Sequence, residues 1–234
     1  MATKTFLDLC QQLVEDAGIT GNFTSVVSQS GEFKRVVNWV ARSVTEVEGL
    51  WFNWDFLNVF HSFDTVVGVR DYPAPADYNL WDYATARLPD REQRLDFIQW
   101  TRQKLDPTKP FNGDPYRYTI LPDKAIRLYD TPVSILTVEI EYWRKPTVLT
   151  ENSSEPAIPE QFRDIVVYKA LWYYANYESA DEAKIQATEN YGARLRQLES
   201  YALPANQASG SINTGTDIVV AVPFDQGLDY RFDY

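Results

Sequence analysis

The chain has 234 residues, of which 44% are hydrophobic and 15% aromatic, and it carries a formal net charge of −11. This much apolar sequence is enough to bury a sizeable core, which excludes disorder of the whole chain. The negative charge is spread along the sequence without a concentrated basic face, so neither nucleic acid nor an anionic membrane is an expected binding partner.

Two amphipathic helices are predicted at the start of the chain. Apolar residues at helical spacing predict the first over residues 3–17, and Gly18 is suited to end it. The second is longer and is predicted from about Glu32 to Trp51, where apolar residues repeat every three or four positions. Several of these residues are β-branched, so we expect tertiary burial to hold this helix.

From Trp54 to about Arg144 the period changes from helical to alternating. Short β-rich runs separated by Pro, Gly, Asp and Asn predict an antiparallel sheet or a small barrel-like sandwich. In the clearest strand, ILTVEIEYW, alternate residues from Leu136 to Tyr142 are expected to face the core. One helical turn is predicted at Thr101–Leu105. The other runs are FLNVFHSF, VVGVRDY, LDFIQW, YRYTIL and AIRLYD.

A helical hairpin is predicted over Pro156–Tyr201. Its first helix begins near Pro159, a residue suited to a first helical turn, and its second runs from about Asp181 to Tyr201. The short turn between them permits only an antiparallel hairpin. Apolar and aromatic residues cover more of the first helix than one packing face requires, which predicts contacts between neighbouring copies of the chain. The residues predicted for these contacts are Tyr168, Trp172, Tyr173 and Tyr177.

The fold class predicted from these elements is α+β. We expect a four-helix bundle, built from the two N-terminal and the two C-terminal helices, with an inserted antiparallel β-rich domain and an extended C-terminal arm. The predicted parts are the N-terminal helical half (1–54), the β-rich inserted domain and linker (55–155), the C-terminal helical hairpin (156–203) and the arm (204–234).

The arm begins as a tether rich in Gly, Ser, Asn and Thr and continues as an apolar, strand-like run from Asp217 to Phe224. Such a run has no reason to stay free in water. It either folds back as a last strand of its own β domain or adds a strand to another subunit or partner. The residues predicted for partner binding are Ile218, Val219, Val220, Val222, Phe224, Tyr230, Phe232 and Tyr234.

No catalytic, cofactor-binding or metal site is predicted. A metal site or a Ser/His/Asp relay needs several His or Cys residues, and the chain has one of each, His61 and Cys10. Cys10 lies on the apolar stripe of the first helix and is expected in the core, where it forms no intrachain disulfide. His61 lies in a strand-like run and is expected at the surface or at a sheet edge. The chain also lacks a glycine-rich phosphate-binding motif.

A carbohydrate-binding or glycan-cleaving module is the alternative that the composition leaves open. Paired carboxylates act as acid and base in glycosidases, and tryptophans stack on sugars. The segment WFNWDFL is interpreted either as such a stacking platform or as the corner where helix becomes sheet. The residues considered are the carboxylates Asp82, Asp90 and Glu92 and the aromatics Trp51, Trp54, Phe56, Trp81 and Trp100.

The sequence predicts a soluble, non-exported protein. No run approaches the roughly 18 apolar residues that a membrane-spanning helix needs. Acidic residues also interrupt the N-terminal segment where a signal peptide would have its apolar core.

Four segments carry a family resemblance: RVVNWVARSVTEVEGLWFNWDFL, IEYWRKPTVLTENSSEPAIPEQF, DIVVYKALWYYANYESADEA and YGARLRQLESYA. Their arrangement resembles the head-to-tail adaptor proteins of tailed bacteriophages, the family that includes the podovirus tail-tube adaptor and related neck proteins. The resemblance covers roughly residues 30–203.

The resemblance implies a non-enzymatic protein without cofactors, located in the neck of a virion and assembled in the host cytoplasm. It implies a ring of twelve copies that binds beneath the portal protein, continues the DNA channel and presents a docking surface to the tail, nozzle or next neck protein. The helical bundle would build the ring and residues 218–234 would reach the portal. The even negative charge suits a channel through which DNA passes without specific binding. A tail-completion protein that contacts the tail and not the portal is a second option.

Overall fold

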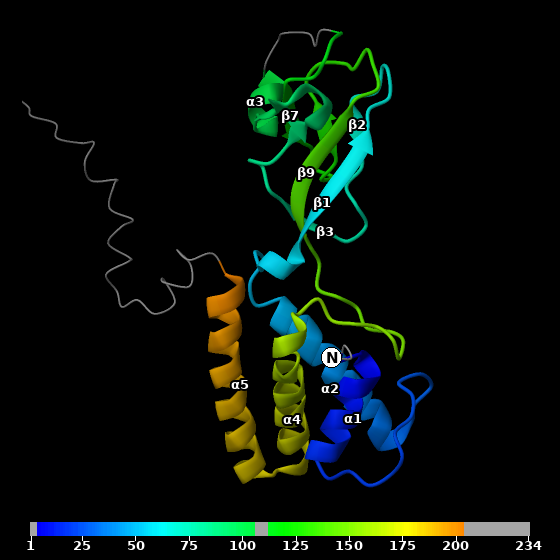
Figure 1. Ribbon diagram of the computed structural model, residues 1–234, viewed down its shortest axis with the longest axis vertical. Coiled ribbons are helices and arrows are strands. Elements are labelled where there is room, and N and C mark those ends of the chain that lie inside the picture. Colours follow the sequence, from blue (N-terminus) through cyan, green and yellow to red (C-terminus); the bar gives the residue numbers. More distant parts are fainter. Residues whose placement is uncertain (1–3, 106–111, 204–234) are drawn as a thin grey trace, which may run out of the picture.

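The computed structural model describes residues 4–105 and 112–203. Within this part of the chain the fold is α+β, with five α-helices and two sheets built mainly of antiparallel strand pairs. Figure 1 shows α1, α2, α4 and α5 at one end of the molecule and the strands at the other, with α3 among the strands. Two stretches, residues 49–57 and 145–159, connect these two ends, and we call them the junction.

The first helix, α1, spans Phe6–Asp16 and begins at a capping box. The backbone N–H of Thr5 donates to Asp8 at 2.8 Å, and the backbone N–H of Asp8 donates to Thr5 Oγ1 at 3.4 Å. Two N–H groups that lack helical partners are thereby satisfied. Gly18 follows the helix with a φ of +65°, in the left-handed region, as predicted for a residue that ends a helix.

The second helix, α2, spans Gly31–Glu48, so the predicted end at Trp51 is wrong. Trp54 accounts for the earlier end, because its side chain is fully buried and its indole N–H donates to the carbonyl of Val47 at 3.2 Å. The Val47 carbonyl, in the last turn of the helix, thus accepts from Trp54 as well as from the backbone N–H of Leu50, and the chain turns toward the strands. The interpretation of this segment as the corner between helix and sheet is confirmed.

The C-terminal helices form the predicted hairpin. After a short 3₁₀ helix at Glu160–Phe162, α4 spans Asp164–Glu178 and α5 spans Asp181–Ala202. Ser179 ends α4 in the left-handed region with a φ of +57°, which reverses the chain within two residues.

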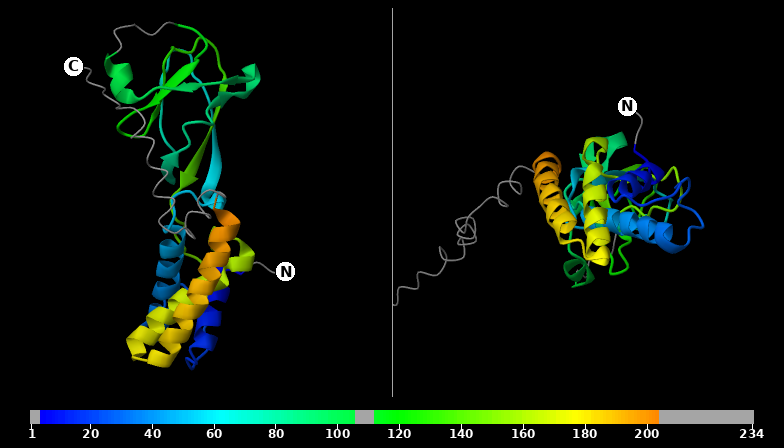
Figure 2. Two further views of the ribbon diagram at one scale, coloured as in Figure 1. Left: turned by 90° about the vertical axis from the view of Figure 1, so that its left-hand side faces the viewer. Right: turned by 90° about the horizontal axis from the view of Figure 1, so that it is seen from below.

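Helix α4 lies at the centre of the helical end, where it packs against α1, α2 and α5 (Figure 2). Three successive residues of α4, Ile165, Val166 and Val167, are all fully buried. Successive residues of a helix point about 100° apart, so a helix that buries three in a row is covered on more than one side. At these three residues, the wide apolar surface predicted for α4 is therefore buried inside the subunit.

The larger sheet has the order β1-β9-β4-β5, with β3 also pairing with β9, and all of its pairs are antiparallel. The predicted inner face of its central strand is confirmed, because Leu136, Val138, Ile140 and Tyr142 are all buried. The strands of this sheet are β1 Asn58–Asp64, β3 Tyr78–Trp81, β4 Arg87–Leu88, β5 Gln93–Arg94 and β9 Thr137–Arg144.

The smaller sheet has the order β2-β8-β7-β6 and contains a parallel pair, β6 with β7. The prediction of an antiparallel domain thus agrees with every strand pair of the two sheets in the described residues except β6 with β7. Parallel neighbours need a crossover connection, and the connection here contains the predicted helical turn, α3, at Trp100–Leu105. The strands of this sheet are β2 Asp71–Tyr72, β6 Asp96–Phe97, β7 Arg117–Ile120 and β8 Ile126–Leu128.

The run VVGVRDY forms a strand only at its last two residues. Gly68 has a φ of +82°, and the backbone N–H of Val69 donates to the carbonyl of Val66 at 2.9 Å, which closes a tight turn. The valines of this run are exposed on that turn instead of lying in a sheet.

A buried carboxylate ties the junction to α2. Glu48 is fully buried, and its two carboxylate oxygens accept backbone hydrogen bonds from Thr147 at 2.6 Å and from Ala157 at 2.7 Å. Burial raises the pKa of Glu48, an effect that the two N–H groups partly offset. In the sequence Glu48 is an ordinary carboxylate near the end of a helix, and no local pattern marks this role.

A buried guanidinium holds the same region from the other side. Arg163 is 7% exposed and donates to the carbonyls of Lys4, Ile158 and Pro156 at 2.7, 3.1 and 3.2 Å. It also forms an ion pair with Glu155 at 2.9 Å. Arg163 therefore joins the N-terminus, the junction and the start of α4 through one rigid side chain.

Candidate assembly interface

A stripe of aromatic and charged side chains follows the line where α2 and α4 pack together. On each helix its members are three or four residues apart, so they lie on one face. We call this set the α2–α4 stripe. Its members are Arg35, Trp39, Arg42 and Glu46 of α2 and Lys169, Tyr173 and Tyr177 of α4.

One end of the stripe is centred on Tyr177, whose side chain is 54% exposed. The guanidinium of Arg35 lies 4.5 Å from the centre of the Tyr177 ring, and the Trp39 ring lies 5.8 Å from it. These contacts hold the ring against α2 and leave about half of its surface exposed.

The other end of the stripe is a hydrogen-bonded cluster around Glu46. Tyr173 donates its hydroxyl proton to Glu46 at 2.5 Å, Arg42 donates at 2.9 Å, and the Lys169 ammonium lies 3.4 Å away. Burial and the bond to Glu46 raise the pKa of Tyr173 to about 12. Burial alone would raise the pKa of Glu46, but the bonds from Tyr173 and Arg42 and the charges of Lys169 and Arg42 outweigh it and lower that pKa.

The structure places three of the four predicted contact residues in or beside the stripe. Tyr173 and Tyr177 belong to it, and the half-buried Trp172 packs edge-on to Tyr173 with a ring separation of 5.2 Å. Lys169 and Lys184 lie 5.2 and 5.7 Å from the Trp172 ring. Tyr168 is half-buried outside the stripe. Contact of these four residues with another copy stays a prediction.

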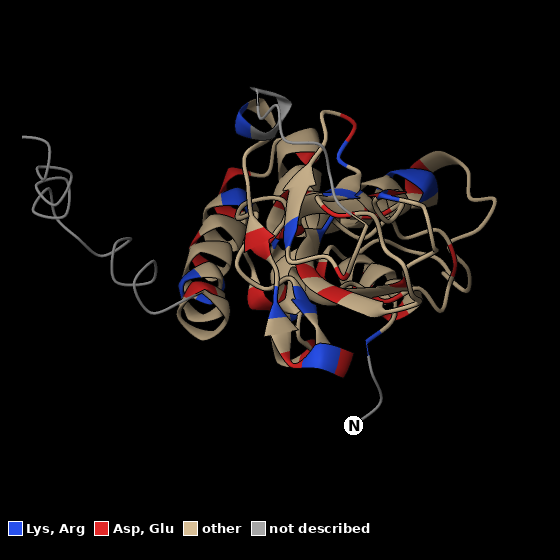
Figure 3. Cartoon of the chain, turned by 90° about the horizontal axis from the view of Figure 1, so that it is seen from above, with Lys and Arg blue, Asp and Glu red and all other residues tan. Residues whose placement is uncertain are grey.

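Charges of both signs are mixed over the surface. Figure 3 shows positive and negative positions interspersed, seen from the β-rich end. Several of them neutralise each other directly, as in the ion pair of Arg127 with Asp71 at 2.6 Å and that of Arg194 with Asp164 at 2.8 Å. At these two pairs the opposite charges lie in direct contact, so each reduces the field that the other exerts on its surroundings.

The predicted partner-binding residues of the arm lie outside the described residues. They are Ile218, Val219, Val220, Val222, Phe224, Tyr230, Phe232 and Tyr234.

The tryptophans proposed for glycan stacking are used in the fold. Trp81 is 1% exposed, and its indole N–H donates to the carbonyl of Lys124 at 3.0 Å. Trp54 is also fully buried, so neither residue offers a ring face to a sugar. The glycan-binding role considered for Trp81 and the stacking role considered for Trp54 are therefore wrong. The half-buried Trp51 donates to Glu199 at 3.1 Å. Trp100 is half-buried, with Arg127 5.4 Å from its ring.

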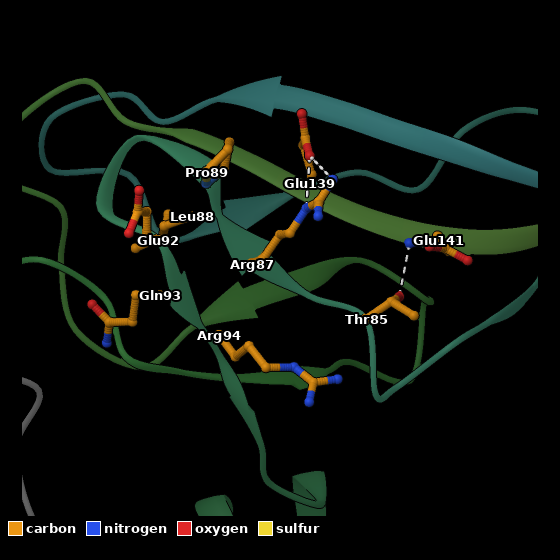
Figure 4. Close-up of a pocket in the computed structure, with 9 residues that line it drawn as sticks. All are labelled: Thr85, Arg87, Leu88, Pro89, Glu92, Gln93, Arg94, Glu139 and Glu141. Carbon is orange, nitrogen blue, oxygen red and sulfur yellow. Dashed lines mark hydrogen bonds and ion pairs between the residues drawn. The ribbon is translucent and has the colours of Figure 1, made fainter.

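A polar groove of about 600 Å³ lies on the outer face of the larger sheet (Figure 4). Its carboxylate Glu139 is paired with Arg87 at 2.8 Å, and none of the lining residues is aromatic. Of the carboxylates considered for catalysis, only Glu92 lines it; Asp90 instead accepts from the backbone N–H of Thr137 at 3.2 Å. The groove therefore lacks the stacking surface of a sugar site. It is lined by Thr85, Arg87, Leu88, Pro89, Glu92, Gln93, Arg94, Glu139 and Glu141.

The single cysteine and histidine lie where the sequence predicts. Cys10 is fully buried in the helical core, and burial raises the pKa of its thiol. His61 lies half-buried on β1, the edge strand of the larger sheet. Within residues 4–105 and 112–203, no three His, Cys, Asp or Glu side chains are grouped so that they could hold a metal ion. No helix in this part of the chain is long and apolar enough to cross a membrane.

A comparison with protein families matches residues 4–215 to the family described as SU10 adaptor protein. A search of curated proteins found no match to the chain. The matched range includes all four segments on which the resemblance to phage head-to-tail adaptors rests, and that resemblance is confirmed. The chain belongs to the SU10 adaptor protein family.

Proposed function

We propose that this protein is a structural, non-enzymatic head-to-tail adaptor in the virion neck of a tailed bacteriophage, assembled in the host cytoplasm. Twelve copies form a ring beneath the portal, continue the DNA channel and offer a docking surface to the tail or the next neck protein. The observation that carries the proposal is the family match across residues 4–215.

In this proposal the helical end of each subunit, residues 1–54 with 156–203, acts as a four-helix bundle and builds the ring. The β-rich part, residues 55–155, is inserted into it. Support comes from the α2–α4 stripe, whose rings are held by contacts within the subunit, with Trp39 and Tyr173 partly buried and Tyr177 54% exposed. Aromatic and arginine side chains in this state are the usual anchors of protein interfaces. The proposed contacts to the neighbouring copy are Tyr168, Trp172, Tyr173 and Tyr177.

The proposed arm, residues 204–234, attaches the ring to the portal through its apolar run and terminal aromatics. The DNA passes through the ring without specific binding. The mixed surface charge and the net charge of −11 support this, since a channel wall without basic clusters does not retain phosphates.

Ring formation is tested with the full-length protein, alone and with purified portal, by sedimentation velocity and negative-stain microscopy. We expect closed rings on the portal. Tyr177→Ala should weaken ring formation by roughly tenfold or more, since it removes a central aromatic anchor. Tyr116→Ala, which removes a similarly exposed ring at the β-rich end, is the matched control. A stable monomer that ignores the portal contradicts the proposal.

The role of the arm is tested by ending the chain after Ala208. The shortened protein should fold, because the helices it retains are complete, but it should lose portal binding. If it loses binding to the tail and keeps binding to the portal, the protein is a tail-completion protein instead. The glycan-binding alternative gains no support from the groove or from the buried tryptophans.

A further inference from the structure

The outer edge of β1 has no partner in the described part of the chain. β1 pairs with β9 along all seven of its residues. No strand among residues 4–105 and 112–203 pairs with its other side, and no further backbone hydrogen bond there involves Val59–Asp64. Alternate residues of an edge strand direct their N–H and C=O groups away from the sheet, so this edge is open to another strand.

The apolar layer under the larger sheet is complete beneath β9 but half open beneath β1. Val138 and Ile140 are 1% exposed and Tyr142 is 6% exposed. The residues directly opposite them on β1 lie on the same face but are only half-buried. One more strand beyond β1 would cover them. These residues are Val59, His61 and Phe63.

The edge of β1 also lacks the features that keep exposed strands apart. Proteins protect such edges with lysines, prolines or bulges, and β1 has no lysine, no proline and no shift in its register with β9. Phe60, on its outer face, is 66% exposed. A strand with these properties is a template for pairing.

The chain that follows α5 starts beside this edge. Tyr201 and Ala202, at the end of α5, line the same pocket as Asp55 and Phe56, which come just before β1. Figures 1 and 2 both show the end of α5 next to the start of β1. The fourteen residues 204–217 span up to about 50 Å when extended. A seven-residue strand is about 23 Å long, so residue 218 can reach either end of β1.

We propose that Ile218–Val222 pairs with the free edge of β1 in the same chain, as an added strand of the free subunit. With alternating side chains, Ile218, Val220 and Val222 lie over the half-open inner face. Pro223 then ends the strand, because proline has no N–H to continue the ladder. When the arm docks on the portal, this segment leaves β1. That exchange rests on the proposed function, whereas the pairing does not.

Hydrogen exchange of the full-length protein without portal tests the pairing. Val220→Pro removes an N–H from the added strand, and Gln207→Pro places the same residue in the tether as a control. We expect amides of Val59–Asp64 to exchange roughly tenfold faster in Val220→Pro than in the wild type or in Gln207→Pro. Equal exchange in all three proteins, with equal circular dichroism, overturns the inference.

Dilution separates pairing within a chain from pairing between chains. If the hydrogen-exchange protection of the β1 amides stays constant when the protein is diluted roughly a hundredfold, the strand comes from the same chain, because binding between two chains weakens on dilution. Protection lost on dilution means that a second copy supplies the strand and overturns the same-chain assignment. Portal binding is measured separately, so a protein that binds the portal without protection of β1 overturns only this inference.

Discussion

The carboxylate of Glu48 accepts a hydrogen bond from the backbone N–H of Thr147, 99 residues further along the chain. Its other oxygen accepts from Ala157, so one side chain of α2 holds the connecting stretch 145–159 at two points ten residues apart. Glu48→Gln cannot accept from both, because the amide nitrogen is itself a donor. We expect a loss of about 1–3 kcal/mol in the free energy of unfolding, the cost of an unpaired buried N–H, measured by urea denaturation. Glu189→Gln, on the exposed side of α5, is the control, and equal stabilities would contradict the prediction.

Arg163→Lys is expected to lower stability although the charge is kept. The guanidinium donates at once to the carbonyls of Lys4, Ile158 and Pro156, and a single ammonium cannot reach three diverging acceptors with the same geometry. The expected loss is about 1–3 kcal/mol by urea denaturation. Arg196→Lys, at an exposed position, should change stability little. A full rescue by lysine would show that only the charge matters.

His61 is the only histidine, so its titration can be followed directly by NMR. Burial among the rings of Phe63, Trp81 and Tyr142 lowers its pKa, and the charge of Asp77 offsets this in part. We expect titration below about 6.5, the value of a free histidine. Because the unfolded chain then binds more protons than the native protein, stability should fall as the pH drops from about 6.5 through the folded pKa. His61→Gln should flatten this part of the pH profile; a pKa at or above the free value contradicts the assignment.

Trp81→Ala is expected to cost about 3–5 kcal/mol of stability, as for other fully buried aromatics. The ring packs against Tyr78 and Tyr142 at 4.8 and 5.5 Å, and its N–H donates to Lys124. Trp100→Ala, at a half-buried position, should cost about 1 kcal/mol or less. Thermal denaturation compares the two proteins. If Trp81→Ala is as stable as Trp100→Ala, the burial of Trp81 is not what holds the β core.

The elements that sequence predicted well are those with a long, regular period. The second helix of the hairpin was predicted to within one residue at each end, while the first begins at Asp164, five residues after the predicted Pro159. The strict alternation of β9 identified that strand. The shortest strands, such as β4 and β5 with two residues each, carry too few side chains to show a period. The parallel pairing of β6 with β7 depends on a crossover that local sequence does not reveal.

The interaction surfaces were harder to predict, because residues with the same local sequence pattern can contact quite different partners in the fold. The spacing of Tyr173 and Tyr177 marks a helix face, but only the structure pairs that face with Arg42 and Arg35 of α2. Glu48 and Arg163 act through partners far away in the sequence, and a charged residue near a helix end is usually solvated. Helical periodicity alone therefore does not predict that Glu48 and Arg163 are buried.

The junction also determines how the molecule responds to force. β1 and β9 both run directly from the junction into the β-rich part, along the long axis of the molecule (Figure 1). Tension along this axis is therefore carried by two covalent chains side by side, while the hydrogen bonds between them lie across the direction of the pull. A pull on the far end of the β-rich part reaches α2 and α4 without first unzipping the sheet.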